Sequence, residues 1–257
     1  MRTRRGRAAA LLLAAVVSGC TEISTDPQVP VSLQFDSLPA LAIVVGDTMR
    51  GGDLLPVKVP VKAFNGAGGV VLDTLIRLRG IDSSSVKAFS VISGLRLVGV
   101  VESPAVRIVA QAGSLQSQTQ TFAVQPRPTG IGNGDTTPDS ILYNATDTTQ
   151  RYRDITATLF RQVGDSAARF LDGLRVRFRV DSFTTSILDS VRLISPNFPG
   201  RSISSALVAS GLATIRVKAY PKAGATGVGT IRVAASFTAL GSPVPLSPAT
   251  IAVKLSP

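Results

Sequence analysis

Histidine and tryptophan are absent from this chain of 257 residues, and cysteine occurs once. Without histidine, neither a Ser/His/Asp triad nor a Cys/His pair can form, and the commonest metal ligand is missing. Two aspartates could still act as the acid and base of a glycosidase. However, no tryptophan is present to stack on a sugar, and aspartates such as Asp47 and Asp53 stand beside turn residues. The composition therefore predicts a protein that is not an enzyme and that binds neither a metal nor a cofactor.

Cys20 follows a segment with the features of an export signal. Four arginines precede an apolar run of ten residues, 8–17, and the small residues Ser18 and Gly19 stand directly before the cysteine. The run is too short for a membrane-spanning helix, which needs about 20 apolar residues. A lone thiol in an exported chain has no disulfide partner, so its position after a small-residue cleavage site indicates another role.

The four residues that end at Cys20 resemble the lipobox of bacterial lipoproteins. The resemblance implies removal of a signal peptide, residues 1–19, and acylation of Cys20, so that two or three acyl chains hold the protein firmly on a membrane. The alternatives are an ordinary export signal and a twin-arginine signal built on Arg4 and Arg5. Because Thr21 is not the aspartate that retains some lipoproteins in the inner membrane, the resemblance favours the outer membrane or the cell surface.

The rest of the chain has the composition of strands and turns. Residues 20–30 carry two prolines and no apolar periodicity, which predicts an extended, lipidated stalk. The remaining length is that of two domains. Short runs rich in Val, Ile, Leu and Thr alternate between apolar and polar residues and are separated by Gly, Asp and Asn. Since no helical period of 3.6 residues occurs beyond the signal, the sequence predicts an all-β fold.

Residues 31–126 are predicted to form a β-sandwich of about seven strands. The strand expected over residues 57–64 contains Pro60, which cannot donate a backbone hydrogen bond, so we expect an edge strand or a bulge there. Four segments of this domain resemble the group 2 bacterial immunoglobulin-like domain: residues 45–48, 81–85, 94–99 and 106–113.

Residues 127–139, rich in proline and glycine, are predicted to link this domain to a second one. Residues 140–257 alternate again and are predicted to form the second sandwich. Its segments 210–215 and 229–233 resemble the late strands of invasin-like, group 1 bacterial immunoglobulin-like domains. The expected fold is therefore two tandem immunoglobulin-like β-sandwiches after a lipoprotein signal peptide.

The net charge of +11 is distributed unevenly. The first domain carries as many acidic as basic residues, whereas residues 127–257 carry 15 basic and 8 acidic ones. On the predicted strands of the second domain, basic residues alternate with apolar ones, which places them on an outward face. If these strands share a sheet, a basic stripe results. Its candidate anion-binding residues are Arg175, Arg177, Arg179, Arg216, Lys218 and Arg232.

Such a stripe suits phosphorylated lipid headgroups, anionic envelope polymers or nucleic acid. Nucleic acid is disfavoured, because neither aromatic platforms nor a recognition helix is evident. The alternative is a solvated face whose cations protect strand edges from aggregation. We expect a non-enzymatic, lipid-anchored protein of the cell envelope, an adhesion or scaffold module that contacts the membrane through its anchor and binds other envelope proteins. A polyanion-binding module of the envelope is the alternative function.

Overall fold

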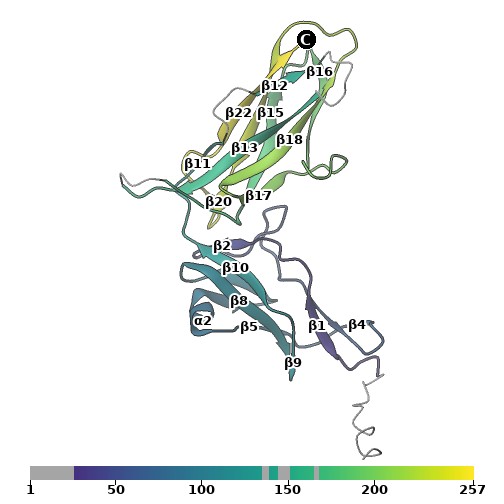
Figure 1. Cartoon of the computed structure of the whole chain (residues 1–257), viewed down its shortest axis with the longest axis vertical. Coiled ribbons are helices and arrows are strands. Elements are labelled where there is room, and N and C mark those ends of the chain that lie inside the picture. The colour runs from purple at the N-terminus through teal and green to yellow at the C-terminus, as the bar shows by residue number, and fades with distance from the viewer. Residues whose placement is uncertain (1–25, 135–138, 144–150, 165–167) are drawn as a thin grey trace, which may run out of the picture.

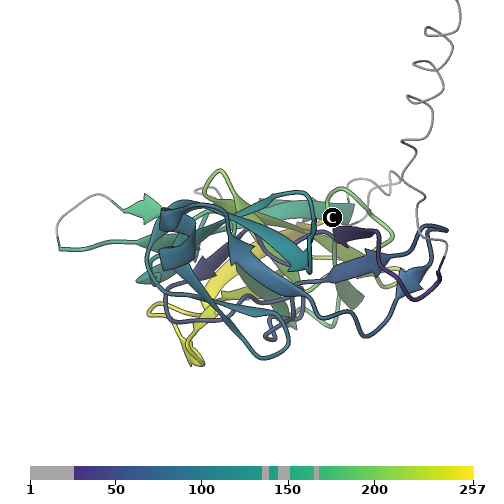
Figure 2. The ribbon, with the colours of Figure 1, turned by 90° about the horizontal axis from the view of Figure 1, so that it is seen from below.

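The computed structural model describes residues 26–134, 139–143, 151–164 and 168–257. In these residues the chain forms two β-sheet units stacked end to end (Figure 1), and in the view from below, along the long axis, the two units overlap (Figure 2). The predicted signal peptide and Cys20 lie outside the described residues. In the described part of the chain, no helix is long and apolar enough to span a membrane.

The first unit consists of two sheets, a hairpin and one short helix. An antiparallel sheet has the order β1-β3-β4, a second sheet has the order β2-β10-β8-β5 with β9 paired to β8, and β6 and β7 form the hairpin. The elements are β1 (Ser32–Phe35), β2 (Ala42–Val44), β3 (Val61–Phe64), β4 (Val70–Val71), β5 (Arg77–Gly80), α2 (Ser83–Ala88), β6 (Phe89–Ile92), β7 (Arg96–Gly99), β8 (Ser103–Ala112), β9 (Leu115–Gln116) and β10 (Gln120–Gln125).

Alternating apolar residues of the two sheets meet in one core. Val106 and Ile108 of β8 are 0% exposed, and they pack with Phe122 of β10 and with Leu33 of β1 from the other sheet. Alternate side chains of a strand point to opposite faces, so one face of each sheet is apolar and the other is solvated.

The expectation of an edge strand or bulge at Pro60 is wrong. Strand β3 begins at Val61, after the proline, and it pairs in regular register with β1 on one side and β4 on the other. Pro60 remains outside the ladder, where its carbonyl oxygen accepts a hydrogen bond from the backbone N–H of Asp36 at 3.0 Å. Because only residues after the proline must donate to a neighbour, the strand can be central.

Helix α2 is an exception to the all-strand expectation. Asp82 caps its N-terminus, since its side chain accepts the backbone N–H of Ser85 at 2.7 Å. The same carboxylate forms an ion pair with Arg107 of β8 at 2.7 Å. Ser85 is fully buried, and its hydroxyl oxygen accepts the backbone N–H of Arg107. The cap and these contacts hold the short helix against the sheet.

The second unit is a larger sandwich. In one sheet, called the β13–β18 sheet, β13 pairs with β11, β14 and β18, and β18 pairs with β16. In the other, called the β15–β19 sheet, the order is β17-β15-β19-β22-β12, and the far end of β17 pairs with β18. The elements are β11 (Gly130–Asn133), β12 (Asp139–Leu142), β13 (Tyr152–Arg161), β14 (Arg169–Phe170), β15 (Arg175–Phe183), β16 (Leu188–Ile194), β17 (Ser205–Ala209), β18 (Leu212–Pro221), β19 (Gly229–Ser236), β20 (Thr238–Ala239), β21 (Ser242–Pro243) and β22 (Ala249–Ser256).

The core of the second unit lies between these two sheets. Ile155 and Ile215 of the β13–β18 sheet and Phe178 and Val233 of the β15–β19 sheet are each at most 1% exposed. The prediction of an all-β fold with two tandem β-sandwiches is confirmed. The predicted linker, residues 127–139, is however partly a strand of the second unit, because β11 pairs with β13.

Candidate functional site

Strand β2 contributes side chains to the cores of both units. It runs parallel to β10, with Ile43 opposite Val124, and lies where the two units meet (Figure 1). Ile43 packs into the core of the first unit, whereas Ala42 and Val44 pack into the core of the second. Because successive side chains of a strand point to opposite faces, one strand at the junction reaches both cores. Separation of the units would expose these buried apolar side chains.

A close backbone approach joins the units beside β2. The backbone N–H of Leu41 donates to the carbonyl oxygen of Gly173 at 3.1 Å. Gly173 has a φ of +79°, and a Cβ added there would lie 2.9 Å from the carbonyl carbon of Leu41. Glycine is therefore required at this position both by the left-handed conformation and by the space available.

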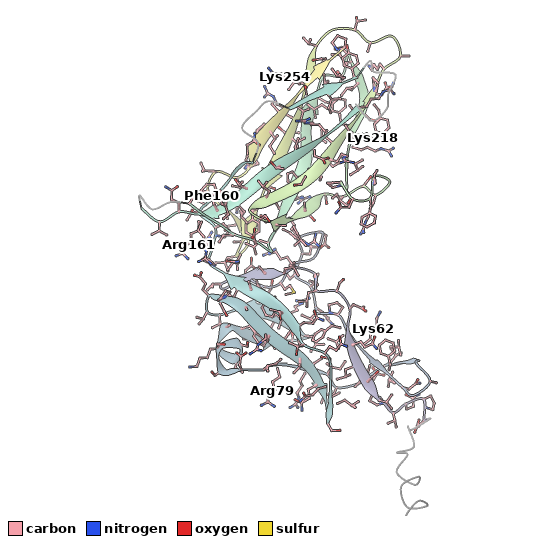
Figure 3. All side chains as sticks on the ribbon, viewed as in Figure 1. Lys62, Arg79, Phe160, Arg161, Lys218 and Lys254 are labelled. Carbon is pink, nitrogen blue, oxygen red and sulfur yellow. The ribbon has the colours of Figure 1, made fainter. Side chains whose placement is uncertain are left out.

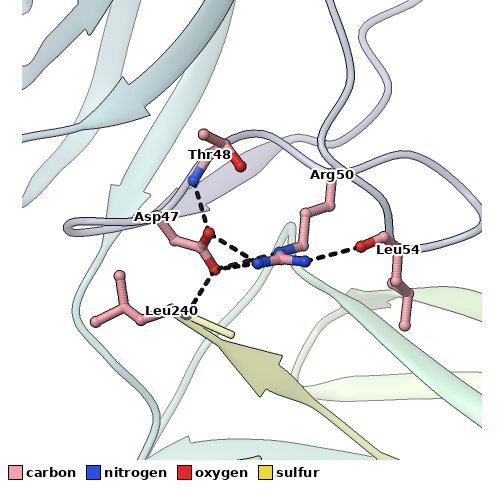
Figure 4. Close-up of polar contacts among 5 residues, drawn as sticks. All are labelled: Asp47, Thr48, Arg50, Leu54 and Leu240. Carbon is pink, nitrogen blue, oxygen red and sulfur yellow. Dashed lines mark hydrogen bonds and ion pairs between the residues drawn. The ribbon is translucent and has the colours of Figure 1, made fainter. Parts of the chain in front are cut away.

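Asp47 is the centre of a polar network at the junction (Figure 4). It is 7% exposed, and its Oδ1 accepts from the backbone N–H of Thr48 at 2.8 Å and from Nη2 of Arg50 at 2.9 Å. Its Oδ2 accepts the backbone N–H of Leu240, in the second unit, at 3.0 Å. Arg50 also donates to the carbonyl oxygen of Leu54 at 2.9 Å. A buried carboxylate needs such partners, since an uncompensated buried charge is costly.

Further polar contacts join the two units. Glu102 of the first unit pairs with Arg169 at 2.6 Å and with Arg161 at 3.8 Å, both in the second unit. Nε of Arg175 donates to the carbonyl oxygen of Pro39 at 2.9 Å. The ion pairs are exposed, so each adds little stability. Arg175, predicted to bind anions, is thus partly committed to holding the units together.

The other predicted anion-binding residues lie on two opposite faces. Strands β15 and β19 are neighbours in one sheet, whereas β18 pairs in the other. Arg177, Arg179 and Arg232 are therefore on the outer face of the β15–β19 sheet, and Arg216 and Lys218 are on the outer face of the β13–β18 sheet. β15 and β18 are connected only through β17, which pairs with both, and they pack on opposite sides of the core, so the predicted residues do not form a single stripe.

The positive charge of Arg216 is compensated by Asp154 on the neighbouring strand β13. Its Nε and Nη2 donate to the two carboxylate oxygens of Asp154 at 2.5 and 2.8 Å. Its guanidinium carbon lies 4.6 Å from the centre of the Tyr152 ring. These hydrogen bonds to Asp154 hold the pKa of Arg216 above its usual value despite partial burial. A bidentate pair of this kind leaves Arg216 poorly suited to an external anion.

Lys218 shares an aromatic ring with a neighbouring cation. Lys218 of β18 lies opposite Arg192 of β16 in the strand register. Nζ of Lys218 lies 5.3 Å, and the guanidinium carbon of Arg192 5.4 Å, from the centre of the Tyr220 ring. Cation–π attraction from one ring stabilises both side chains in place.

The outer face of the β15–β19 sheet carries one further cation that the sequence analysis missed. Lys254 of β22 is exposed, and it alternates with buried Val253 and Leu255. In Figure 3, Lys254 and Lys218 lie on opposite sides of the second unit. The alternating pattern of β22 could have predicted that Lys254 points outward. Only the pairing of β22 with β19 places Lys254 beside Arg232.

A polar groove adjoins this face at the junction. Its walls include Arg175, Arg201 and Asp53, and its volume is 440 Å³. Burial, and secondarily the nearby charge of Arg201, lower the pKa of Arg175 from its usual value. The groove is also lined by the hydroxyl-bearing residues Ser37, Ser202, Ser204 and Ser205. Sequence reasoning missed Arg201, because it lies in the loop between β16 and β17 rather than on a strand.

No group of three His, Cys, Asp or Glu side chains that could hold a metal ion occurs among the residues that the structure describes. Cys20, predicted to be lipidated, lies outside that part of the chain. No family model matches the sequence, and no curated protein matches it.

The chain is similar to several solved structures. They include domains 1–6 of the surface layer protein SbsC (13% identity, 90% of this chain and 28% of that one, TM-score 0.32). The adhesin InvE of Yersinia pseudotuberculosis is 10% identical over 87% of this chain and 58% of its own, with a TM-score of 0.34. An endo-fucoidan hydrolase of glycoside hydrolase family 107 is 10% identical over 89% of this chain and 35% of its own, with a TM-score of 0.35. Similarities at this level assign no function, and the chain spans only a part of each of these proteins.

Proposed function

We propose that the chain is a non-enzymatic module of a bacterial cell envelope, anchored by lipid at Cys20, whose two sandwiches form one stiff arm for adhesion or scaffolding. The observation that supports this function most directly is strand β2, whose side chains are buried in both cores. Domains joined by a small polar interface move relative to each other, whereas a shared apolar element opposes such motion.

The geometry of the junction supports stiffness in three ways. Bending would remove Ala42 and Val44 from the second core, which costs about 25 cal/mol for each Å² of apolar surface exposed. Bending would also separate Asp47 from Leu240 and leave a buried carboxylate with fewer partners. Finally, bending would have to break the ion pair of Glu102 with Arg169 and the hydrogen bond of Arg175 to Pro39.

The lipid anchor and the arm together suggest how the protein would work. Acylation at Cys20 would fix the lower end of the first unit close to a membrane, through the stalk of residues 20–30. The second unit would then be held away from the lipid at a fixed orientation. Adhesion and scaffolding both need such a spacer, and neither needs catalytic groups.

Distance measurements between two spin labels test the stiffness on which this function depends. We would replace Cys20 by serine, introduce Ser114→Cys in the first unit and Ala223→Cys in the second, and measure the distribution of label distances by double electron–electron resonance. A stiff arm gives one narrow distribution. The matched variant adds Gly173→Arg, which forces a side chain against Leu41, and is expected to broaden the distribution. A broad distribution before that change would refute the proposal.

A further inference from the structure

We propose that the outer face of the β15–β19 sheet, together with the groove at its junction end, binds a linear anionic polysaccharide. The binding residues are the cationic stripe, defined as Arg177, Arg179, Arg232 and Lys254. This inference is independent of the lipid anchor, but the groove depends on the junction, because both units line it. It differs from the basic stripe expected from sequence, because it omits the β18 residues and includes Lys254.

The strand register arranges the stripe as a diagonal. Arg179 of β15 lies opposite Ala234 of β19, and Lys254 of β22 lies opposite Thr230 of β19. Arg232 stands midway between Ala234 and Thr230 on β19, on the same face. Strands are about 4.8 Å apart and two residues span about 6.7 Å, so successive charges of the diagonal are separated by roughly 8 Å. Arg177 extends the line toward the junction, and the whole stripe is roughly 20 Å long.

The charges of the stripe are almost entirely uncompensated. Within the described residues, no carboxylate pairs with Arg177, Arg232 or Lys254, and only Arg179 has a partner, Asp181 at 2.9 Å. That pair is exposed, with the Arg179 side chain 70% accessible, so solvent screens it. Like charges on one sheet face repel each other and focus a positive potential outward. A polymer with regularly spaced negative groups would relieve this repulsion along its whole length.

The surface between the cations favours a polysaccharide. The outward residues of β19 and β22 between them are small, as Ala234, Ala252 and Thr250 show. A linear polymer can therefore lie flat across the strands, with its charged groups beside the arginines. Nucleic-acid-binding sheets usually add aromatic rings for base stacking, and these outward positions of β15, β19 and β22 hold none.

One end of the polymer would be bound in the groove. Arg175 and Arg201 lie in it, with Ser202 and Ser204 among the other lining residues. Only Nε of Arg175 has a hydrogen-bond partner among the described residues, so its remaining N–H groups can reach a ligand. Two arginines and several hydroxyl groups suit a carboxylate or sulfate, and the volume of 440 Å³ accommodates a sugar residue. Asp53 also lines the groove, at the wall formed by the first unit.

A pair of charge-matched variants tests the proposal. In the full chain, Arg177→Glu combined with Arg232→Glu alters the stripe, whereas Arg192→Glu combined with Lys218→Glu makes the same change in net charge on the opposite sheet. Binding of polygalacturonate and of heparin is measured by isothermal calorimetry at 50 and 200 mM salt. We expect the stripe variant to bind at least tenfold more weakly and with a smaller salt dependence, and the control variant to bind within twofold of the unchanged protein. Equal losses in both variants, or no loss in either, would overturn the proposal.

Further measurements test the groove, the kind of ligand and the folding of the variants. Arg201→Glu is expected to weaken binding of polygalacturonate, because it adds a negative charge to the groove, and unchanged affinity would remove the groove from the site. A single-stranded oligonucleotide and vesicles with anionic phospholipid are compared at the same salt. Tighter binding of either than of both polysaccharides would contradict the assignment. Thermal unfolding of each variant by circular dichroism checks that both sandwiches remain folded.

Discussion

At the scale of single residues, Asp47 differs most from its expected role. The sequence placed it beside a turn, and it does follow Gly46 at the end of β2. Its burial, and its bond to Leu240, depend on a hairpin of the second unit that lies 193 residues away along the chain. No local pattern predicts such a partner. Turn-forming and charge-pairing aspartates look the same in a single sequence.

Replacement of Asp47 by asparagine is expected to lower the free energy of unfolding by about 2–3 kcal/mol, because it leaves Arg50 partly buried without its counter-charge. Urea denaturation followed by circular dichroism measures the change. The control is Asp36→Asn, which breaks an exposed pair with Lys62 and should cost about 0–1 kcal/mol. Similar losses for the two variants would show that the junction network contributes no special stability.

At the scale of elements, helix α2 shows why short helices are hidden from periodicity. It has six residues, fewer than two turns, so no apolar stripe can repeat along it. The sequence feature that indicates this helix is its N-terminal cap, Asp82 followed by three serines. Long strands are easier to predict, because apolar and polar residues alternate several times along them. Such alternation indicated the strands β13, β15, β18, β19 and β22.

The pairing of those strands could not be read from alternation. Alternation shows which side chains point outward, and Arg177, Arg179 and Arg232 do so. It does not show which strands are neighbours, because that depends on contacts between distant segments. For this reason the sequence left open whether β15 and β18 are neighbours, and the predicted set of basic residues missed Lys254 on β22.

The cap of α2 leads to a prediction of how the stability of the fold depends on pH. Hydrogen bonds from Ser84 and Ser85, and then from Arg107, hold the pKa of Asp82 well below its usual value of 3.8. Because the pKa is lower in the folded state, the carboxylate stabilises the fold fully above the unfolded-state pKa and loses that effect as the pH falls. The urea midpoint of Asp82→Asn should therefore lie below that of the unchanged protein at pH 7.

The gap between these two midpoints should narrow below pH of about 4, where the unfolded-state carboxyl group becomes protonated. The measurement is a series of urea titrations from pH 7 to pH 3. A gap that stays constant or widens on acidification would show that the charge of Asp82 is not what stabilises the cap.

At the scale of the whole molecule, the sequence indicated two all-β domains but not their connection through β2. A signal for the connection was present in residues 41–45, a continuous apolar run. Strands buried on both faces have such runs, whereas strands with one solvated face alternate. All three residues of β2 are buried, and the two faces belong to different cores.

The predicted lipid anchor determines where the whole molecule is found in the cell. We expect the intact protein to sediment with membranes after cell lysis and to be released only by detergent, and Cys20→Ser to remain in the soluble fraction. Fractionation followed by immunoblotting measures this. Mass spectrometry of the mature amino terminus provides the control, since an unmodified thiol there would contradict the anchor.

The end-to-end stacking has a mechanical consequence. The described chain starts at the free end of the first unit, and Pro257 lies at the free end of the second (Figure 1). Tension between a surface below and a ligand held above would pass through the junction in series with both sandwiches. Hydrogen-bonded ladders run along most of each sandwich, whereas the junction consists of one short shared strand and a few polar bonds. The arm should therefore lengthen first at the junction, where Ala42 and Val44 would leave the second core while the hydrogen-bonded ladders of both sandwiches stay intact.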